Sequence, residues 1–185
     1  MDDRSLVDAI LGGDQDAYRL LVEREATTVF RCCYRVLGHI QDAEDISQDT
    51  FVIAYRSLGS WRGDGSLRAW LARIATRQAL RAVDRGRLAS AVELDDDIEH
   101  LEPMMAAAGE EPLPSLLTSE RAAQVRASVA ALPEPYRETI ALRYFAGLTP
   151  DEIALAVGRP VGTVKVHAHR ALARLRLALA EVQVA

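Results

Sequence analysis

The first half of the sequence contains a row of evenly spaced arginines. They recur every four residues, which places them along one face of a helix: Arg73, Arg77, Arg81 and Arg85. Neighbouring cations repel one another, and a polyanion lying along the row would offset that repulsion. Trp61 precedes this helix, and a cationic track beside an aromatic ring is what single-stranded nucleic acid binding requires. A solvated arginine face with a buried tryptophan is the alternative interpretation.

A second cationic face is predicted near the C-terminus, on a helix that follows a tight turn. It consists of Thr163, His167, Arg170 and Arg174, beside an apolar stripe that includes Val164, Ala171 and Leu175. The segment before it starts with Thr149 as cap, Pro150 at the first position and Glu152 completing a capping box. Gly158 is the expected left-handed stop of that first helix.

Two helices joined by a glycine-containing turn, the second with a cationic face, predict a helix-turn-helix. In that motif the second helix enters the major groove of DNA with its N-terminal residues toward the base edges. An amphipathic helical hairpin with a solvated basic face is the alternative.

The sequence shows no pattern typical of a metal site or of catalysis. Cys32 and Cys33 are adjacent and are expected to be ordinary helix residues, and no spaced set of Cys and His exists to hold zinc. No nucleophile with a base and no glycine-rich phosphate loop is visible. We therefore predict that the protein is not an enzyme and has no cofactor. A nuclease acting on the strand along the arginine row is the weaker hypothesis.

Charge is distributed unevenly along the 185 residues, whose formal net charge is −5. Residues 60–91 hold seven basic and two acidic side chains, residues 92–118 hold eight acidic and no basic ones, and residues 119–185 hold nine basic and six acidic ones. Two basic blocks separated by an acidic one suit a nucleic-acid-binding protein better than the total charge suggests. No apolar run reaches the length of a membrane span and no leader precedes the chain, so a soluble, cytoplasmic protein is expected.

Helical periodicity on both sides of the acidic block predicts an all-α protein of two small domains. The predicted domains are residues 1–91 and 119–185, and residues 92–118 are predicted to be an acidic flexible linker. The expected helices are Arg4–Leu11, Asp14 to Gly38, one restarting at Asp42, one capped by Ser66, one from Ser119 to about Leu132, Tyr136–Phe145, and the two of the helix-turn-helix. Leu20 is expected to face the core from the second helix, and Tyr55 from the third.

Polar side chains gather at the start of the third predicted helix: Asp42, Glu44, Asp45, Gln48 and Asp49. Acidic residues near a helix N-terminus are favourable in themselves, because they compensate the helix dipole. A docking surface for a partner is the other interpretation.

Three stretches together resemble the extracytoplasmic-function (ECF) group of bacterial sigma factors: DAEDISQDTFVIAYRSLGSW, LRAWLARIATRQALR and LPEPYRETIALRYFAGLTPDEIALAVGRPVGTVK. The resemblance covers nearly the whole chain in the family's order. It implies a non-catalytic subunit that binds the clamp and flap of core RNA polymerase, melts the minus-10 promoter element and reads the minus-35 element. It also implies that an anti-sigma factor could hold the protein.

The resemblance assigns residues to three surfaces. The polar helix from Asp42 to Asp49 matches the surface that docks on the polymerase clamp, and the loop from Ser60 to Gly65 matches the segment that captures a flipped-out base. The candidate minus-10 residues are Ser60, Trp61, Arg62, Gly63, Asp64, Arg73, Arg77 and Arg81. The candidate minus-35 residues are Arg137, Thr163, Lys165, Val166, His167, Arg170 and Arg174.

The chain departs from the family pattern at a few positions. Arg77 and Arg81 stand where the family usually has asparagine and aspartate, and His167 stands where it usually has arginine. Neutral histidine cannot bind guanine bidentately as arginine does. The string GTVKVHAHRALARL also resembles the helix-turn-helix of LuxR-type regulators, so a regulator that binds duplex operators without polymerase is the alternative function.

Overall fold

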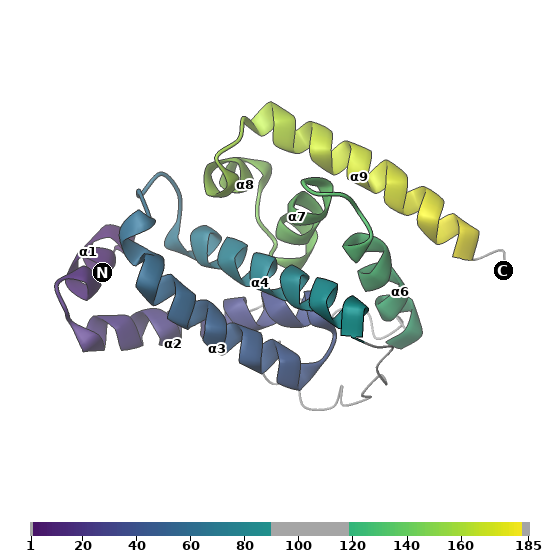
Figure 1. The fold of residues 1–185 in the computed structure, drawn as a ribbon. Coiled ribbons are helices and arrows are strands. Elements are labelled where there is room, and N and C mark those ends of the chain that lie inside the picture. The colour runs from purple at the N-terminus through teal and green to yellow at the C-terminus, as the bar shows by residue number, and fades with distance from the viewer. Residues whose placement is uncertain (1, 90–118, 183–185) are drawn as a thin grey trace.

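The computed structural model describes residues 2–89 and 119–182, and every regular element in those two ranges is helical. The predicted linker, residues 92–118, lies outside the described residues. The elements, shown in Figure 1, are α1 (Asp3–Leu11), α2 (Gln15–Leu37), α3 (Ile40–Ser57), the short 3-10 turn η1 (Leu58–Ser60), α4 (Leu67–Ala89), α6 (Ser119–Ala130), α7 (Tyr136–Ile140), the π-helical turn η2 (Ala141–Phe145), α8 (Pro150–Val157) and α9 (Val161–Val182).

Local capping explains most of the helix boundaries. Asp14 caps α2 by accepting from the backbone N–H groups of Asp16 and Ala17, and Gly38 ends that helix with φ 76°. The third helix starts at Ile40 and not at Asp42, so the expected restart at Asp42 was wrong. The cap is His39, whose Nδ1 accepts from the Asp42 backbone N–H at 3.5 Å. Histidine is an unusual cap, and sequence reasoning therefore overlooked it.

The three long helices α2, α3 and α4 pack around an apolar core, with α1 across their end. Fully buried members include Leu6, Leu21, Leu58 and Leu71. Two residues expected in this core are instead exposed, Leu20 at 45% and Tyr55 at 53%. Each is adjacent in sequence to a fully buried residue, Leu21 or Ala54, and so lies one step outside the buried stripe of its helix.

In the C-terminal half, the helix expected from Tyr136 to Phe145 changes its hydrogen-bonding pattern at Ala141. The Ala146 N–H donates to the Ala141 carbonyl at 3.0 Å, which is the i to i+5 bond of a π-helical turn. The Arg143 guanidinium then donates to the Leu148 carbonyl at 2.9 Å. This widened turn sets the direction of the chain into α8.

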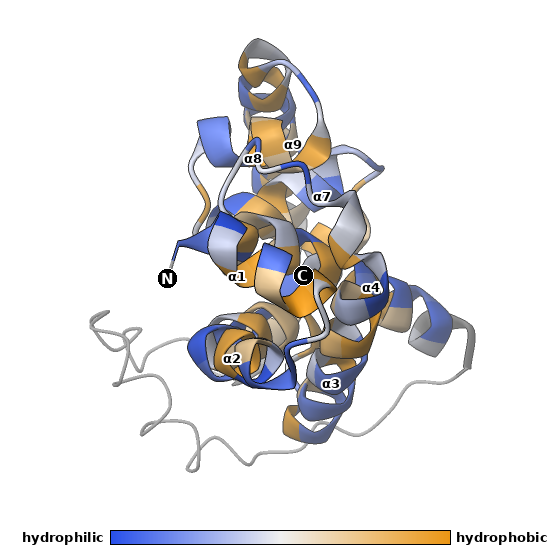
Figure 2. Ribbon diagram, turned by 90° about the vertical axis from the view of Figure 1, so that its left-hand side faces the viewer, coloured by the Kyte–Doolittle hydropathy of each residue, from blue (hydrophilic) through white to orange (hydrophobic). Residues whose placement is uncertain are grey.

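The two halves of the chain share one hydrophobic core. Leu142, Leu148, Ile153 and Val164 of the C-terminal half belong to the same buried cluster as the side chains of α1 to α4. A smaller cluster, which includes Val129, Ile140 and Leu175, joins α6, α7 and α9. Figure 1 shows α7 and α8 between α4 and the long α9, and Figure 2 shows hydrophobic segments of the packed helices toward the interior. The C-terminal half therefore packs directly on the helix that carries the arginine row.

Candidate nucleic-acid interface

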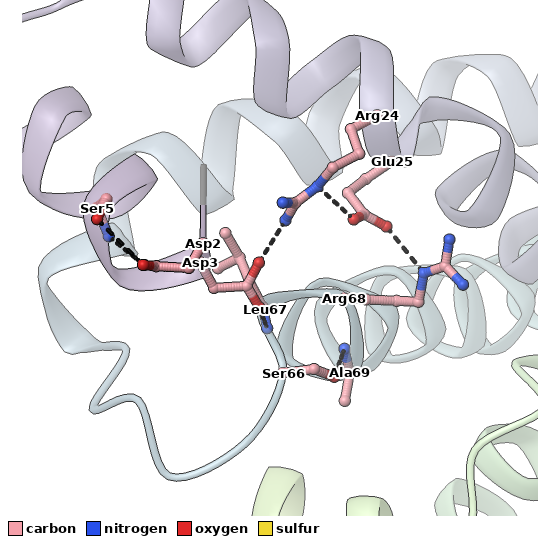
Figure 3. Close-up of polar contacts among 9 residues, drawn as sticks. All are labelled: Asp2, Asp3, Ser5, Arg24, Glu25, Ser66, Leu67, Arg68 and Ala69. Atoms are coloured by element: carbon pink, nitrogen blue, oxygen red, sulfur yellow. Dashed lines mark hydrogen bonds and ion pairs between the residues drawn. The ribbon is translucent and has the colours of Figure 1, made fainter.

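A network of polar contacts fixes the start of α4, just after the glycine-rich loop (Figure 3). One carboxylate oxygen of Asp3 accepts from the Leu67 backbone N–H at 2.8 Å, and the other accepts from Arg24 at 2.7 Å. The Ser66 hydroxyl accepts from the Ala69 backbone N–H at 3.2 Å and so caps α4 as expected. Helices α1 and α2 therefore hold the end of the loop in place.

Glu25 extends this network into the interior between α2 and α4. Its residue is only 3% exposed, and its two oxygens lie 2.9 Å from Nε of Arg24 and 3.1 Å from Nε of Arg68. A buried carboxylate is stable when cations and hydrogen bonds satisfy it, and here one guanidinium binds each oxygen. Figure 3 shows the carboxylate bridging the two helices. This pairing links α2 to the first turn of α4.

The loop between η1 and α4 exposes most of its candidate residues. Ser60, Arg62, Gly63 and Asp64 are exposed, whereas Trp61 is half-buried and packs against the core. Gly63 has φ +77°, and a Cβ at this position would lie 2.8 Å from the Arg4 guanidinium, so only glycine fits without strain.

A cavity of about 330 Å³ adjoins the loop. The loop and α4 line one side with Trp61, Arg62, Trp70 and Arg73, and the end of α8 from Leu155 to Gly158 lines the other. Both the aromatic and the cationic groups expected near the loop therefore face one space, and part of its wall comes from the C-terminal half.

The arginine row of α4 divides into an exposed part and a paired part. Arg81 and Arg85 are exposed. Arg73 and Arg77 are half-buried, and their Nε atoms lie 3.2 Å and 3.8 Å from the same Glu138 oxygen on α7. The expectation of a single cationic face along the outside of α4 therefore holds only for its second half.

The helix-turn-helix forms as its caps predict. Thr149 and Glu152 make both bonds of the capping box, and Gly158 ends α8 with φ 68°. On α9 the side chains of Lys165, Val166, Arg170 and Arg174 are exposed, and those of Thr163 and His167 are half-buried.

Arg137, the remaining candidate for the minus-35 element, lies apart from this face. Its side chain is 14% exposed on α7, and its Nη1 donates to the Asp84 carboxylate of α4 at 2.7 Å. It also donates to the Ala130 carbonyl at 3.3 Å. The structure thus does not bring Arg137 onto the exposed face of α9.

His167 packs against Tyr136, a residue that sequence reasoning did not single out. The two rings meet edge to face with centroids 5.4 Å apart, and the Arg174 guanidinium lies 5.4 Å from the Tyr136 centroid. Burial lowers the pKa of His167, and the nearby cations Arg159 and Arg170 lower that pKa further. His167 is therefore neutral at pH 7. Its comparison with the family's usual arginine, made from the sequence, likewise treated this side chain as a neutral histidine. Tyr136 directly follows a proline-rich break in the sequence. Its contact with His167 becomes apparent only from the packing of α7 on α9.

The polar residues of α3 form one exposed face. Asp42, Glu44, Asp45, Gln48 and Asp49 are all exposed, on the side away from the buried Ala43, Ile46 and Thr50. Val52 and Tyr55 extend the same face and are 47% and 53% exposed. Their spacing from Asp45 and Asp49 could have indicated this strip from the sequence. The face therefore changes from acidic to apolar along the helix.

Within residues 2–89 and 119–182, no group of three or more His, Cys, Asp and Glu side chains gathers as a metal site would require. Nor is any helix of that described part long and apolar enough to cross a membrane. Cys32 and Cys33 form no disulfide, and burial raises the pKa of their thiols to about 12 and about 11. Both are protonated core side chains.

Comparison with known proteins places this chain in a family. Residues 21–88 match Sigma-70 region 2, and residues 122–175 match Sigma-70, region 4. The chain is 36% identical over 172 residues to the RNA polymerase sigma-H factor of Pseudomonas aeruginosa, covering 91% of this chain and 89% of that protein. It is 31% identical over 175 residues to the ECF RNA polymerase sigma factor SigW of Bacillus subtilis, covering 92% of each. The chain belongs to the ECF group of the sigma-70 family.

Solved structures agree with this assignment. The sigma factor superposes on CnrH in its complex with the cytosolic domain of CnrY with a TM-score of 0.64, at 26% identity and 97% coverage of both chains. It shares its fold with RpoE of Bartonella quintana, solved with the anti-sigma factor NepR, at a TM-score of 0.54, 21% identity and coverage of 88% and 96%. The resemblance seen in the sequence is confirmed, and the all-helical fold with it. The LuxR-type alternative is not favoured, because the N-terminal half matches region 2. The family consists of transcription initiation factors rather than enzymes.

Proposed function

We propose that this sigma factor directs core RNA polymerase to promoters through three surfaces on two domains. The observation that carries the proposal is the match of both halves, in order, to regions 2 and 4 of the sigma-70 family. Residues 1–91 are the domain that binds polymerase and opens DNA, residues 119–185 are the domain that reads duplex DNA, and residues 92–118 connect them. The protein acts in the cytoplasm, where its polymerase and promoters are.

The exposed face of α3 is the surface we assign to core polymerase. Asp42, Glu44, Asp45, Gln48 and Asp49 share it, and Val52 and Tyr55 extend it. A face that is acidic at one end and apolar at the other suits a partner surface with basic residues beside an apolar patch. A clamp element of polymerase is the partner that we infer.

The loop and the arginine row are the surface we assign to the minus-10 element. Ser60, Arg62, Gly63 and Asp64 surround the half-buried Trp61 next to the cavity, which suits a base removed from its stack. Arg73, Arg77 and Arg81 would then bind phosphates of the same strand. The cost of extruding a base is a few kcal/mol, which stacking and phosphate contacts together can offset.

The exposed face of α9 is the surface we assign to the minus-35 duplex. Lys165 and Val166 lie in the first turns of the helix and would face base edges, with Thr163 and His167 beside them. Arg170 and Arg174 lie further along, where phosphates follow the groove. Arg137 would bind the DNA backbone from α7.

In vitro transcription tests the proposal. Purified core polymerase is incubated with and without the full-length protein on a library of genomic fragments, and transcript starts are mapped. We expect start sites that appear only with the protein and that share minus-35 and minus-10 elements. The proposal fails if the protein neither associates with core polymerase nor changes where transcription starts.

An anti-sigma factor is a further proposed partner. The solved relatives CnrH and RpoE were each captured with a second protein, and the RpoE partner is described as an anti-sigma factor. Co-purification of a stoichiometric protein from the native host, with loss of transcription on its addition, would identify such a regulator here.

A further inference from the structure

Three of the arginines assigned above to DNA are bound to carboxylates across the boundary between the two halves. Glu138 of α7 contacts Arg73 and Arg77 of α4, at 3.2 Å and 3.8 Å, and only 8% of the Glu138 residue is exposed. The next residue toward the N-terminus, Arg137, contacts Asp84 of α4 at 2.7 Å. Two adjacent residues of opposite charge on α7 therefore each form an ion pair with a side chain of α4.

The spacing of the partners gives both α7 residues an oppositely charged neighbour in this alignment of the helices. Arg73, Arg77 and Asp84 are separated by four and seven residues, so they share one face of α4. Sliding α7 by two turns along α4, about seven residues, would place Glu138 beside Asp84 or Arg137 beside Arg77, and both arrangements repel. We call Arg73, Arg77, Asp84, Arg137 and Glu138 the clasp.

Apolar contacts and a hydrogen bond close the same boundary beside the clasp. Leu142 and Ile153 are each 0% exposed within the cluster that the α1 to α4 side chains form. Arg35 of α2 donates to the Phe145 carbonyl at 2.8 Å. At the far end, Leu155 of α8 lies so near the loop that a Cβ on Gly65 would be 3.3 Å from it. The C-terminal half thus covers α4 from the loop to Asp84.

This closed arrangement is incompatible with a DNA strand along the first half of the arginine row. The Glu138 carboxylate already occupies the place where a phosphate would bind Arg73 and Arg77. The wall that α8 contributes also narrows access to the cavity beside Trp61. Arg81 and Arg85 remain exposed, so the barrier concerns the part of the row nearest the loop.

We propose that the clasp is an autoinhibitory contact, in which Glu138 and Asp84 hold the free protein closed and compete with DNA for the arginines. The inference rests on the proposed function, because it assigns a regulation to the same DNA-binding residues. Separation of the two halves when the protein binds polymerase would expose Arg73, Arg77 and Arg137 together. Free protein therefore binds DNA weakly, and only the polymerase-bound form presents both surfaces.

The test compares three full-length variants that each remove one negative charge: Glu138→Gln, Asp84→Asn and Asp151→Asn. Asp151 is the matched control, because it is exposed in the first turn of α8 and outside the clasp. Anisotropy of a labelled single-stranded oligonucleotide measures DNA affinity, and small-angle X-ray scattering measures the radius of gyration. Asp84→Asn keeps the test decisive if Glu138→Gln misfolds, since the Asp84 side chain is 43% exposed.

We expect Glu138→Gln and Asp84→Asn to bind the oligonucleotide about fivefold or more tightly than Asp151→Asn and to have a larger radius of gyration than wild type. Equal affinities of the three variants for the oligonucleotide would overturn the autoinhibition. Tighter binding without an increase in the radius of gyration would also overturn it. Start-site mapping with core polymerase separates the two claims. If wild type selects start sites while the three affinities are equal, the sigma function stands and only the autoinhibition fails.

Discussion

At the scale of single residues, α9 presents two kinds of side chain. Arg170 is exposed and charged, so it can reach DNA without rearrangement. His167 is neutral and held against Tyr136, with its Nδ1 buried and without a hydrogen-bond partner among the described residues. His167, which stands where the family usually has arginine, therefore adds a packed ring to this face of α9 rather than a positive charge. We therefore expect the remaining cations of α9 to contribute a larger share of duplex binding.

Replacing Arg170 with alanine should weaken binding to the minus-35 duplex by about tenfold, because one cation at the groove is lost. Arg176→Ala is the matched control: Arg176 is exposed on the same helix, and six residues place it on a different face. Anisotropy titrations at two salt concentrations measure both affinity and the number of ions released. Identical affinities for the two variants would remove Arg170 from the DNA face.

At the scale of elements, the start of α3 decides between two explanations of its acidic residues. Dipole compensation acts mainly within the first turn of a helix. Because α3 begins at Ile40, Asp42 lies in that turn, but Asp45 and Asp49 lie beyond it. Dipole compensation therefore accounts for Asp42 but not for Asp45 and Asp49, and for these two carboxylates we keep the proposed role in binding polymerase.

Reversing charge in the variant Asp45→Lys with Asp49→Lys should reduce affinity for core polymerase by at least about tenfold, because like charges would face a basic partner. Helix content should change little, since neither side chain caps α3. Glu23→Lys on α2 is the control, as Glu23 is exposed and outside the α3 face. Equal recovery of wild type and variant in a pull-down with core polymerase would return these residues to a solubilising role.

At the scale of the whole molecule, one core joins segments that two family regions describe separately. Region 2 ends at residue 88 and region 4 begins at residue 122, yet Leu142 and Ile153 are buried against the region 2 helices. A shared core couples the stability of the two halves. Under the proposed function, the two halves are therefore expected to separate before each binds its own DNA element.

The free protein should therefore unfold in a single cooperative transition. Leu142→Ala should lower the free energy of unfolding by about 2–5 kcal/mol, because it removes a fully buried side chain at the boundary. Leu177→Ala is the control, since Leu177 is 69% exposed. Calorimetry measures both the number of unfolding transitions and the change in the free energy of unfolding. Two resolved transitions in the wild-type protein would show that the halves fold independently and that the shared core contributes little.

The sequence by itself determined the helices and most of their ends. Asp14, the Thr149 and Glu152 capping box, Gly38 and Gly158 act on backbone groups within a few residues, so their effect can be read from neighbours alone. The exposed polar faces of α3 and α9 also follow from periodicity. The cap at His39 and the π-helical turn at Ala141 were missed, because neither residue type has a strong preference for that role.

Only the tertiary structure decided which charges meet. Periodicity indicates that Arg73 and Arg77 lie on a polar face, but the carboxylate that binds them comes from Glu138, more than sixty residues away. The same holds for Arg137 with Asp84 and for His167 with Tyr136. Such pairs depend on how two helices are placed against each other, and that placement results from burying Leu142 and Ile153 in a common core. The local pattern of a helix specifies its faces, whereas the partner of each face is chosen by packing over the whole chain.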